Sequence, residues 1–228
     1  MQFTADQVRS WRNGADGFLA WIKDVQPRIP AHKGGFAIFV PADFQEEAIR
    51  EALEQIDGKW RYQTIAFSFP RRHSKTTLMA LLVVWRFTLH GPGENIVCMA
   101  NSERQTLSVG YSQVKSIILN TPFILAQVGR ENVRQYDIRH PKLQNKIQAV
   151  SCNVAGLYGQ KITIGWVSEI HAAISDEAMQ VLASSLGDTE GSWLLVDSTV
   201  DGPGGPLHNL EKLQASGEDP TVYVKRVS

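Results

Sequence analysis

Lys75 and Thr76 stand side by side between two apolar segments, Thr64 to Phe69 before them and Leu78 to Trp85 after them. A lysine followed at once by a hydroxyl residue, where a strand passes into a helix, is typical of a phosphate-binding loop. The ammonium group reaches the β- and γ-phosphates, the hydroxyl ligates Mg²⁺, and the helix start adds free N–H groups. The pair therefore predicts a site for ATP and Mg²⁺ formed by Pro70, Arg71, Arg72, His73, Ser74, Lys75, Thr76 and Thr77.

The same loop lacks the glycines of the usual phosphate-loop pattern, G-x-x-x-x-G-K-[ST], whose glycine positions fall on Phe69 and Ser74. Glycine matters there because it adopts positive φ angles and lets the backbone approach the phosphates closely. A polar turn before a buried helix, with Lys75 in solvent, is the alternative that this loop alone leaves open.

Glu169 follows another apolar run, Ile162 to Ser168. A carboxylate at a strand end can polarise the water that attacks a phosphate, so Glu169 is the expected catalytic residue. The position before it, where a second carboxylate would orient the metal, holds Ser168. Metal binding is therefore assigned to Thr76, weakly to Ser168, and through water to Glu169.

A third polar segment follows the apolar run Ser192 to Ser198. Its hydroxyl residues lie at a strand end and a glycine follows them, so they are expected to sense the γ-phosphate and couple it to movement. An ordinary turn is the alternative. The predicted coupling residues are Ser198, Thr199 and Gly202.

Strand and helix patterns alternate along the chain. The strands expected are Thr64–Phe69, Asn95–Ala100, Lys146–Ser151, Ile162–Ser168, Ser192–Ser198 and Thr221–Val227, and the helices Lys75–His90, Glu103–Leu119, Asp176–Ser185 and Leu207–Ala215. Two of the strands are apolar throughout, which requires a sheet covered on both faces. This order predicts an α/β fold with a mostly parallel sheet flanked by helices, and ligands bind at the carboxyl ends of such strands.

The N-terminal part is expected to be separate. Residues 4–23 are weakly helical, and the proline- and glycine-rich residues after them are typical of a connector. Residues 1–35 are therefore assigned to a helical arm or lid with its linker, and residues 36–228 to the main domain. Asp43 is expected to cap an amphipathic helix that reaches Ile56.

Composition excludes several classes of protein. Lys plus Arg (23) equals Asp plus Glu (23), so any contact with nucleic acid must be local. The longest apolar run is far shorter than the ~20 residues that span a bilayer, and no secretory signal opens the chain. Cys98 and Cys152 lack metal-ligand spacing, which favours buried, reduced thiols in an intracellular protein.

Together these motifs resemble the ATPase half of the large subunit of tailed-bacteriophage terminase. The segment "PRRHSKT" is similar to that family's P-R-x-x-G-K-[ST] loop, and "WVSEIH" resembles its strand ending in Asp-Glu. The segment "STVDG" resembles its coupling motif, and "CMANSERQT" the strand and helix that follow its loop helix. The pair Phe44-Gln45 resembles its adenine motif, which implies that Gln45 binds the nucleotide.

The resemblance implies a RecA-like P-loop NTPase of the additional-strand, catalytic-glutamate type. It implies a homo-oligomeric ring that works on a portal protein, with a small terminase subunit, and packs double-stranded DNA into a procapsid in the host cytoplasm, without a membrane. The family's nuclease domain is expected to be absent from this chain. Arg71 is assigned as a second catalytic residue, but Tyr158 stands where several relatives have an arginine finger, so Arg71, Arg72 and Arg139 all stay candidates.

Two alternatives belong to other functional classes. One is a nucleotide-binding assembly module that hydrolyses little ATP, because Ser74 and Ser168 replace residues of the usual motifs. The other is a different RecA-like ATPase that acts on nucleic acid, such as a helicase, which would need a second domain of the same fold.

Overall fold

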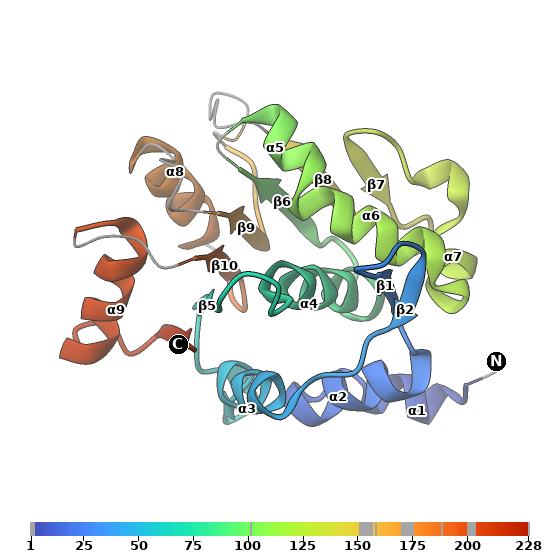
Figure 1. The fold of residues 1–228 in the computed structure, drawn as a ribbon, viewed down its shortest axis with the longest axis horizontal. Coiled ribbons are helices and arrows are strands. Elements are labelled where there is room, and N and C mark those ends of the chain that lie inside the picture. The colour runs from blue at the N-terminus through green and yellow to red at the C-terminus, as the bar shows by residue number, and fades with distance from the viewer. Residues whose placement is uncertain are drawn as a thin grey trace.

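The computed structural model describes residues 3–100, 102–150, 157, 159–169, 176–187, 189–199 and 204–227 (Figure 1). Every strand expected from the apolar runs is present, with ends that differ from the expected bounds by at most two residues. These strands are β5 (Thr64–Ser68), β6 (Asn95–Met99), β8 (Lys146–Val150), β9 (Ile164–Ser168), β10 (Trp193–Ser198) and β11 (Val222–Arg226).

These six strands and β7 form one seven-stranded sheet in the order β11-β5-β10-β9-β6-β8-β7. All neighbours are parallel except β7 (Asp137–Arg139), which pairs antiparallel with β8. The strand before the loop and the strand before Glu169 are not neighbours, because β10 lies between them. The mostly parallel α/β sheet is thus confirmed, and β10 separates the two predicted motifs.

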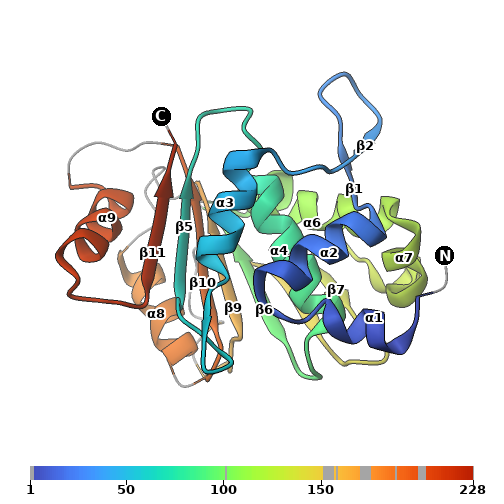
Figure 2. The same ribbon diagram turned by 90° about the horizontal axis from the view of Figure 1, so that it is seen from below.

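Helices cover both faces of the sheet, as Figures 1 and 2 show. One face carries α4 (Lys75–Leu89) at its centre, with α5 (Glu103–Ser108), α6 (Gly110–Asn120) and α7 (Pro122–Val128) beside it; the other carries α8 (Asp176–Gly187) and α9 (Pro206–Ser216). Helix α4 is buried almost all round because the N-terminal helices cover its outer side. None of the described helices has the length and apolarity that a membrane crossing needs.

Alternation along β10 divides its side chains between two cores. Trp193 and Leu195 belong to the apolar cluster that contains α4, whereas Leu194 and Val196 belong to the cluster that contains α8. Successive side chains of a strand point to opposite faces, so the side chain of Asp197, like those of Trp193 and Leu195, points to the face that α4 covers. The same alternation puts Trp166 and Ser168 of β9 on that side.

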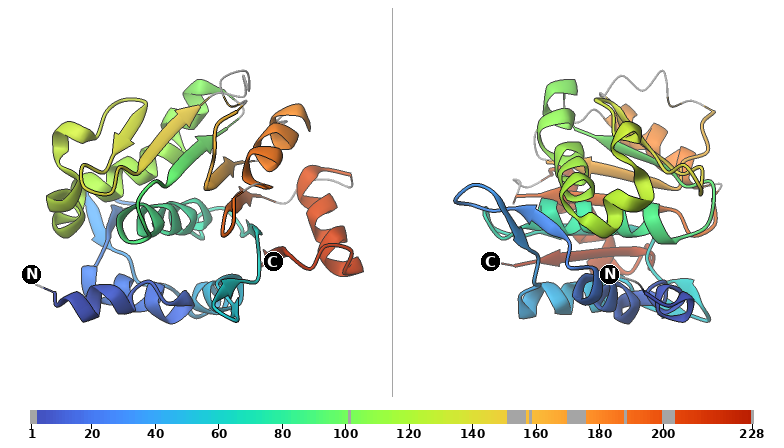
Figure 3. Two further views of the ribbon diagram at one scale, coloured as in Figure 1. Left: turned by 180° about the vertical axis from the view of Figure 1, so that it is seen from behind. Right: turned by 90° about the vertical axis from the view of Figure 1, so that its right-hand side faces the viewer.

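The N-terminal helices pack on α4 through aromatic side chains. Helices α1 (Ala5–Ser10), α2 (Gly14–Val25) and α3 (Asp43–Ala52) form a row along the bottom of both views in Figure 3. Trp11, Phe18 and Trp21 are fully buried, and Trp85 Nε1 donates to the Trp11 carbonyl oxygen at 2.8 Å. A boundary between residues 35 and 36 stays a prediction.

The segment expected to be a connector contains a β-hairpin. Strands β1 (Arg28–Pro30) and β2 (Phe36–Ile38) pair antiparallel, and Gly34 and Gly35 supply positive φ angles in the turn. No hairpin was expected in this segment, because its strands are short and exposed: Phe36 is 51% and Ile38 49% exposed.

Some helix bounds also differ from those expected. Helix α3 begins without an Asp43 cap: its N-cap is Ala42, whose N–H donates to Gln45 Oε1 at 2.9 Å. It ends at Ala52, because β3 (Gln55–Ile56) turns at Asp57 and pairs with β4 (Lys59–Trp60).

Two further regions of helix depart from the predictions. The helix expected over residues 4–23 divides into α1 and α2, and the helix expected over 103–119 divides at Val109, which is not helical. A short 3₁₀ helix, Arg130–Asn132, precedes β7.

Cys98 is buried, which raises the pKa of its thiol, and Cys152 lies outside the described residues.

Candidate functional site

The loop between β5 and α4 has a left-handed backbone where glycine is usual. Ser74 has φ 58° and ψ 26°, and Arg72 has φ 71°. Phe69 does not share this conformation; it is buried, with its ring 5.2 Å from that of Phe67 and 5.4 Å from that of Phe44. Ser74, at the second glycine position, thus has the left-handed backbone that glycine usually adopts, whereas Phe69, at the first, belongs to the core.

Gln45 holds this loop from α3. Its side chain is buried, and Nε2 donates to the His73 carbonyl oxygen at 2.9 Å. The His73 N–H donates to the Pro70 carbonyl oxygen at 3.2 Å, which closes the turn. The structure therefore places Gln45 behind the loop, and its contact with a nucleotide stays a prediction.

Lys75 and Glu169 come from different motifs and meet in space. Lys75 Nζ lies 3.4 Å from Glu169 Oε1, and the lysine side chain is only 8% exposed. Glu169 has φ 56°, and its N–H donates to the Asp197 carbonyl oxygen at 2.8 Å, which fixes it against β10. An ammonium group and a carboxylate are thus paired at the carboxyl edge of the sheet.

Thr76 contacts a carboxylate that no sequence motif indicated. Its Oγ1 donates to Asp197 Oδ2 at 2.6 Å, and Trp166 Nε1 donates to Asp197 Oδ1 at 2.7 Å. Burial raises the pKa of Asp197 to about 6, although its hydrogen bonds with Thr76 and Trp166 lower it. One signal was present in the sequence: Asp197 is a charged residue within an apolar strand.

Of the other predicted metal and coupling residues, Ser168 lies beside this carboxylate. Ser168 is buried and pairs in register with Asp197. Ser198 follows Asp197 on β10, so alternation directs its side chain to the opposite face, and its Oγ donates to the Thr199 carbonyl oxygen at 2.7 Å. Coupling by Ser198 and Thr199 stays a prediction, and Gly202 lies outside the described residues.

The candidate arginines lie at different places. Arg71 and Arg72 are exposed on the loop, and Arg72 lines the cleft beside it. Arg139 lies on the edge strand β7, where its Nε is 2.9 Å from Asp137 Oδ1. Tyr158, at the position of the finger in several relatives, lies outside the described residues.

A cleft of about 510 Å³ separates the loop from the β1–β2 hairpin. Both elements lie at the end of the sheet to which the strand arrows point in Figure 2. The hairpin side was missed because that segment was interpreted as a connector. The cleft is lined by Ile29, Pro30, Ala31, His32 and Ala37 of the hairpin segment and by Pro70, Arg72, Ser74, Lys75, Thr76 and Thr77 of the loop and α4.

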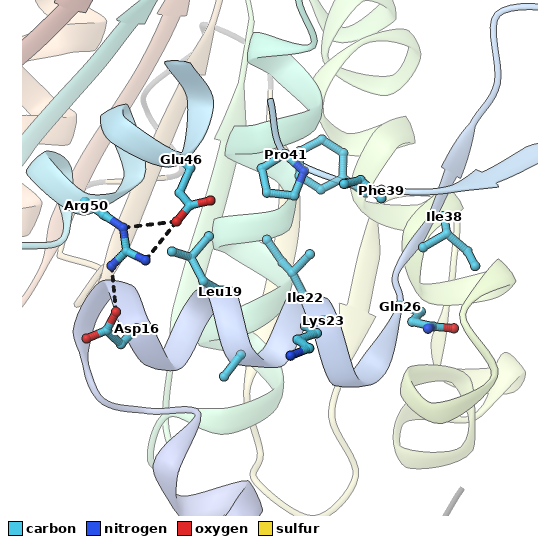
Figure 4. A pocket seen from close by; sticks show the side chains of 12 residues that line it. Asp16, Leu19, Ile22, Lys23, Gln26, Ile38, Phe39, Pro41, Glu46 and Arg50 are labelled. Atoms are coloured by element: carbon cyan, nitrogen blue, oxygen red, sulfur yellow. Dashed lines mark hydrogen bonds and ion pairs between the residues drawn. The ribbon is translucent and has the colours of Figure 1, made fainter. Parts of the chain in front are cut away.

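A second cavity lies between α2, α3 and the segment after β2 (Figure 4). Its wall is largely apolar, with Leu19, Ile22 and Phe39, and Arg50 at one end bonds Asp16 and Glu46. None of the predicted site residues lines it. The cleft beside Lys75 is lined by six residues of the predicted loop, and Glu169 pairs with Lys75, so this cleft is the candidate site.

Comparison with known proteins agrees with this architecture. No protein-family model and no curated protein matches the sequence. The large terminase of bacteriophage HK97 matches the structure with a TM-score of 0.75 and 16% identity, over 93% of this chain and 43% of the terminase. The large terminase of the thermophilic bacteriophage D6E matches with a TM-score of 0.50 and 12% identity, over 73% and 40%.

These matches show the fold. The chain has the RecA-like architecture of phage large terminases, as the resemblance of its motifs predicted, with a small helical part at its N-terminus. It spans less than half the length of either terminase.

Proposed function

We propose that this chain is the ATP-hydrolysing part of a viral DNA-packaging motor of the terminase large-subunit type. The observation that carries the proposal is that Lys75 and Thr76 line one cleft at the carboxyl edge of a RecA-like sheet, with Glu169 3.4 Å from Lys75. This edge is where ligands bind in open α/β sheets. The fold shared with phage large terminases supports the same function.

The nucleotide phosphates would bind at the start of α4, with the hairpin as the opposite wall. The first N–H groups of a helix have no partners within it and attract anions, and Lys75 adds a positive charge there. Phosphate would compete with Glu169 for Lys75, which lies 3.4 Å away. The carboxylate of Glu169 would then accept a proton from the attacking water.

The oxygen donors of the site fit Mg²⁺. The Thr76 hydroxyl lies against the buried carboxylate of Asp197, and Mg²⁺ prefers such hard oxygen ligands together with phosphate oxygens. Thr76 would hold the ion. When bound, Mg²⁺ would neutralise negative charge that develops on the β- and γ-phosphate oxygens.

The wider role follows from the terminase likeness. In this proposal a homo-oligomeric ring of the protein stands on a portal, receives viral DNA with the help of a small terminase subunit, and moves it into a procapsid in the host cytoplasm. The nuclease would belong to a longer form of the protein or to a separate chain. Because the net charge is zero, DNA would be held by a few loops.

A second candidate function is favoured by Ser168. An uncharged residue at that position is consistent with an assembly module that binds ATP and turns it over very slowly. Such a module would bind ATP as tightly as the motor but would show no measurable phosphate release.

Two substitutions in the candidate site test the proposal. Glu169→Gln should lower kcat about 10²-fold or more while ATP still binds, because it removes the base but not the phosphate contacts. Lys75→Ala should weaken ATP binding itself, because it removes the positive charge from the phosphate site. Phosphate release and binding of a fluorescent ATP analogue, measured in parallel, separate the two effects.

Matched changes on the exposed surface are the controls. Lys212→Ala and Glu218→Gln alter the same residue types outside the cleft and should leave both quantities unchanged. ATPase activity that persists in both site variants would contradict the proposed mechanism. Tight ATP binding without turnover in the wild type would favour the assembly module.

A further inference from the structure

Ser168 leaves one position of the candidate site without charge. It ends β9 immediately before Glu169, it is buried, and its Oγ makes no hydrogen bond within the part of the chain that the structure describes. A hydroxyl carries no charge to offset that of a divalent cation. If the site has a carboxylate on its metal side, that carboxylate therefore comes from another element.

Asp197 brings a carboxylate to this place from the neighbouring strand. Strands β9 and β10 are parallel and pair Ser168 with Asp197, so the two side chains share a face, about 4.8 Å apart across the strands. Its Oδ2 accepts from Thr76 Oγ1 at 2.6 Å. The negative charge thus lies against the hydroxyl that ligates the metal in phosphate loops of this kind.

A structural role alone does not explain a charge at Asp197. The carboxylate is fully buried, and hydrogen bonds from Thr76 and Trp166 offset only part of the cost of burying a charge. An asparagine could keep a bond with each partner: its Oδ1 could accept from Trp166 Nε1 and its Nδ2 could donate to Thr76 Oγ1. The charge points to a cation that binds beside it.

We propose that Asp197 is the metal-side acid of this site and replaces, from β10, the carboxylate that Ser168 lacks on β9. The inference rests on the proposed function, because it assigns a residue to the cation of the same nucleotide site. Asp197 orients the Thr76 hydroxyl and offsets the charge of the cation. A small Ser168 suits this arrangement, because two carboxylates on paired positions of one face repel each other.

The test measures how strongly Mg²⁺ tightens nucleotide binding. The dissociation constant of fluorescently labelled ADP is determined in EDTA and in Mg²⁺. The value in EDTA divided by the value in Mg²⁺ is then compared between variants. Asp197→Asn should reduce this ratio about tenfold or more. The affinity of this variant for ADP in EDTA should stay near the wild-type value, because Lys75 and the start of α4 are unchanged.

Moving the carboxylate back to β9 gives the complementary test. The double variant Ser168→Asp with Asp197→Asn should recover most of the Mg²⁺ effect. Trp166→Phe is the structural control: it removes the hydrogen bond to Oδ1 but keeps the charge, so the Mg²⁺ effect should persist. An unchanged ratio in Asp197→Asn, or no recovery in the double variant, overturns the inference.

A measurement on the wild-type protein keeps the test independent of folding in the variants. With Mn²⁺ and ADP bound, pulsed electron paramagnetic resonance of protein labelled with ¹³C at the aspartate carboxyl carbon should show coupling to Mn²⁺. Absence of that coupling also overturns the inference. If the wild type binds no nucleotide in either condition, the proposed function fails instead, and the inference fails with it.

Discussion

The backbone at Ser74 takes a conformation that glycine usually supplies in a phosphate-binding loop. A left-handed conformation costs a non-glycine residue roughly 1–2 kcal/mol. Contacts on both sides hold it: Gln45 bonds the neighbouring His73, and the Leu78 N–H donates to the Ser74 carbonyl oxygen at 2.9 Å. The conformation that glycine adopts freely is here imposed by the surrounding structure.

Replacing Ser74 by glycine should therefore preserve or increase stability. The relief of strain exceeds or balances the extra freedom of the unfolded chain, about 0.4–1 kcal/mol, so we expect a gain of up to about 1.5 kcal/mol. Urea unfolding followed by circular dichroism measures this change. Ser116→Gly, within the right-handed helix α6, is the control and should lose about 0.5 kcal/mol. Equal losses in both variants would show that Ser74 is not strained.

At the scale of elements, the approach of α1 to α2 positions the N-terminal part on α4. A Cβ atom on Gly17 would lie 2.7 Å from the carbonyl oxygens of Ser10 and Trp11, closer than such atoms are found. The same turn brings the Trp11 carbonyl oxygen to Trp85 of α4. Only glycine allows this packing, because backbone cannot move aside as a flexible side chain can.

Gly17→Ala should destabilise the protein by about 1–3 kcal/mol, the usual cost of forcing an atom into a packed interior. Chemical unfolding monitored by tryptophan fluorescence is a suitable measurement, because Trp11 and Trp21 are both buried in this region. Gly91→Ala is the matched control: apart from its two chain neighbours, no heavy atom of the described residues would lie within 4 Å of a Cβ atom there. An equal effect at the two glycines would contradict the packing argument.

At the scale of the whole molecule, a buried histidine links folding to pH. The His90 ring packs against Trp85, with centroids 4.3 Å apart. Burial, with the Arg86 guanidinium as a smaller cause, lowers the pKa of His90 to about 3. An unfolded histidine has a pKa of about 6.5, so below that pH the unfolded chain binds a proton that the folded chain does not. The contribution to stability is complete above about pH 6.5 and is lost progressively towards pH 3.

We therefore expect the free energy of unfolding to fall by roughly 1 kcal/mol from pH 7.5 to pH 5.5 through His90 alone. His90→Asn, which cannot take up this proton, should have a correspondingly shallower pH dependence. Unfolding curves of both proteins at several pH values give the difference. Burial also lowers the pKa of His140, but this residue is present in both proteins and cancels. Parallel pH profiles would exclude His90 as the cause.

Local patterns in the sequence determined much of the fold. The apolar runs located the strands of the parallel sheet, and the order of Lys75, Thr76 and Glu169 located the loop and the strand end that form the candidate site. Such runs are informative because strands buried on both faces must be apolar throughout. The β1–β2 hairpin escaped prediction, because its strands are short and exposed and so carry no apolar signal.

The tertiary structure alone decided which elements meet. No local pattern encodes that β10 lies between β5 and β9, and this strand order and register bring Asp197 beside Thr76 and Ser168. The same holds for Ser74, whose left-handed backbone depends on contacts from α3 and α4. The sequence determined which residue types were available for phosphate chemistry. Long-range strand pairing and packing decided that the Asp197 carboxylate lies beside Thr76.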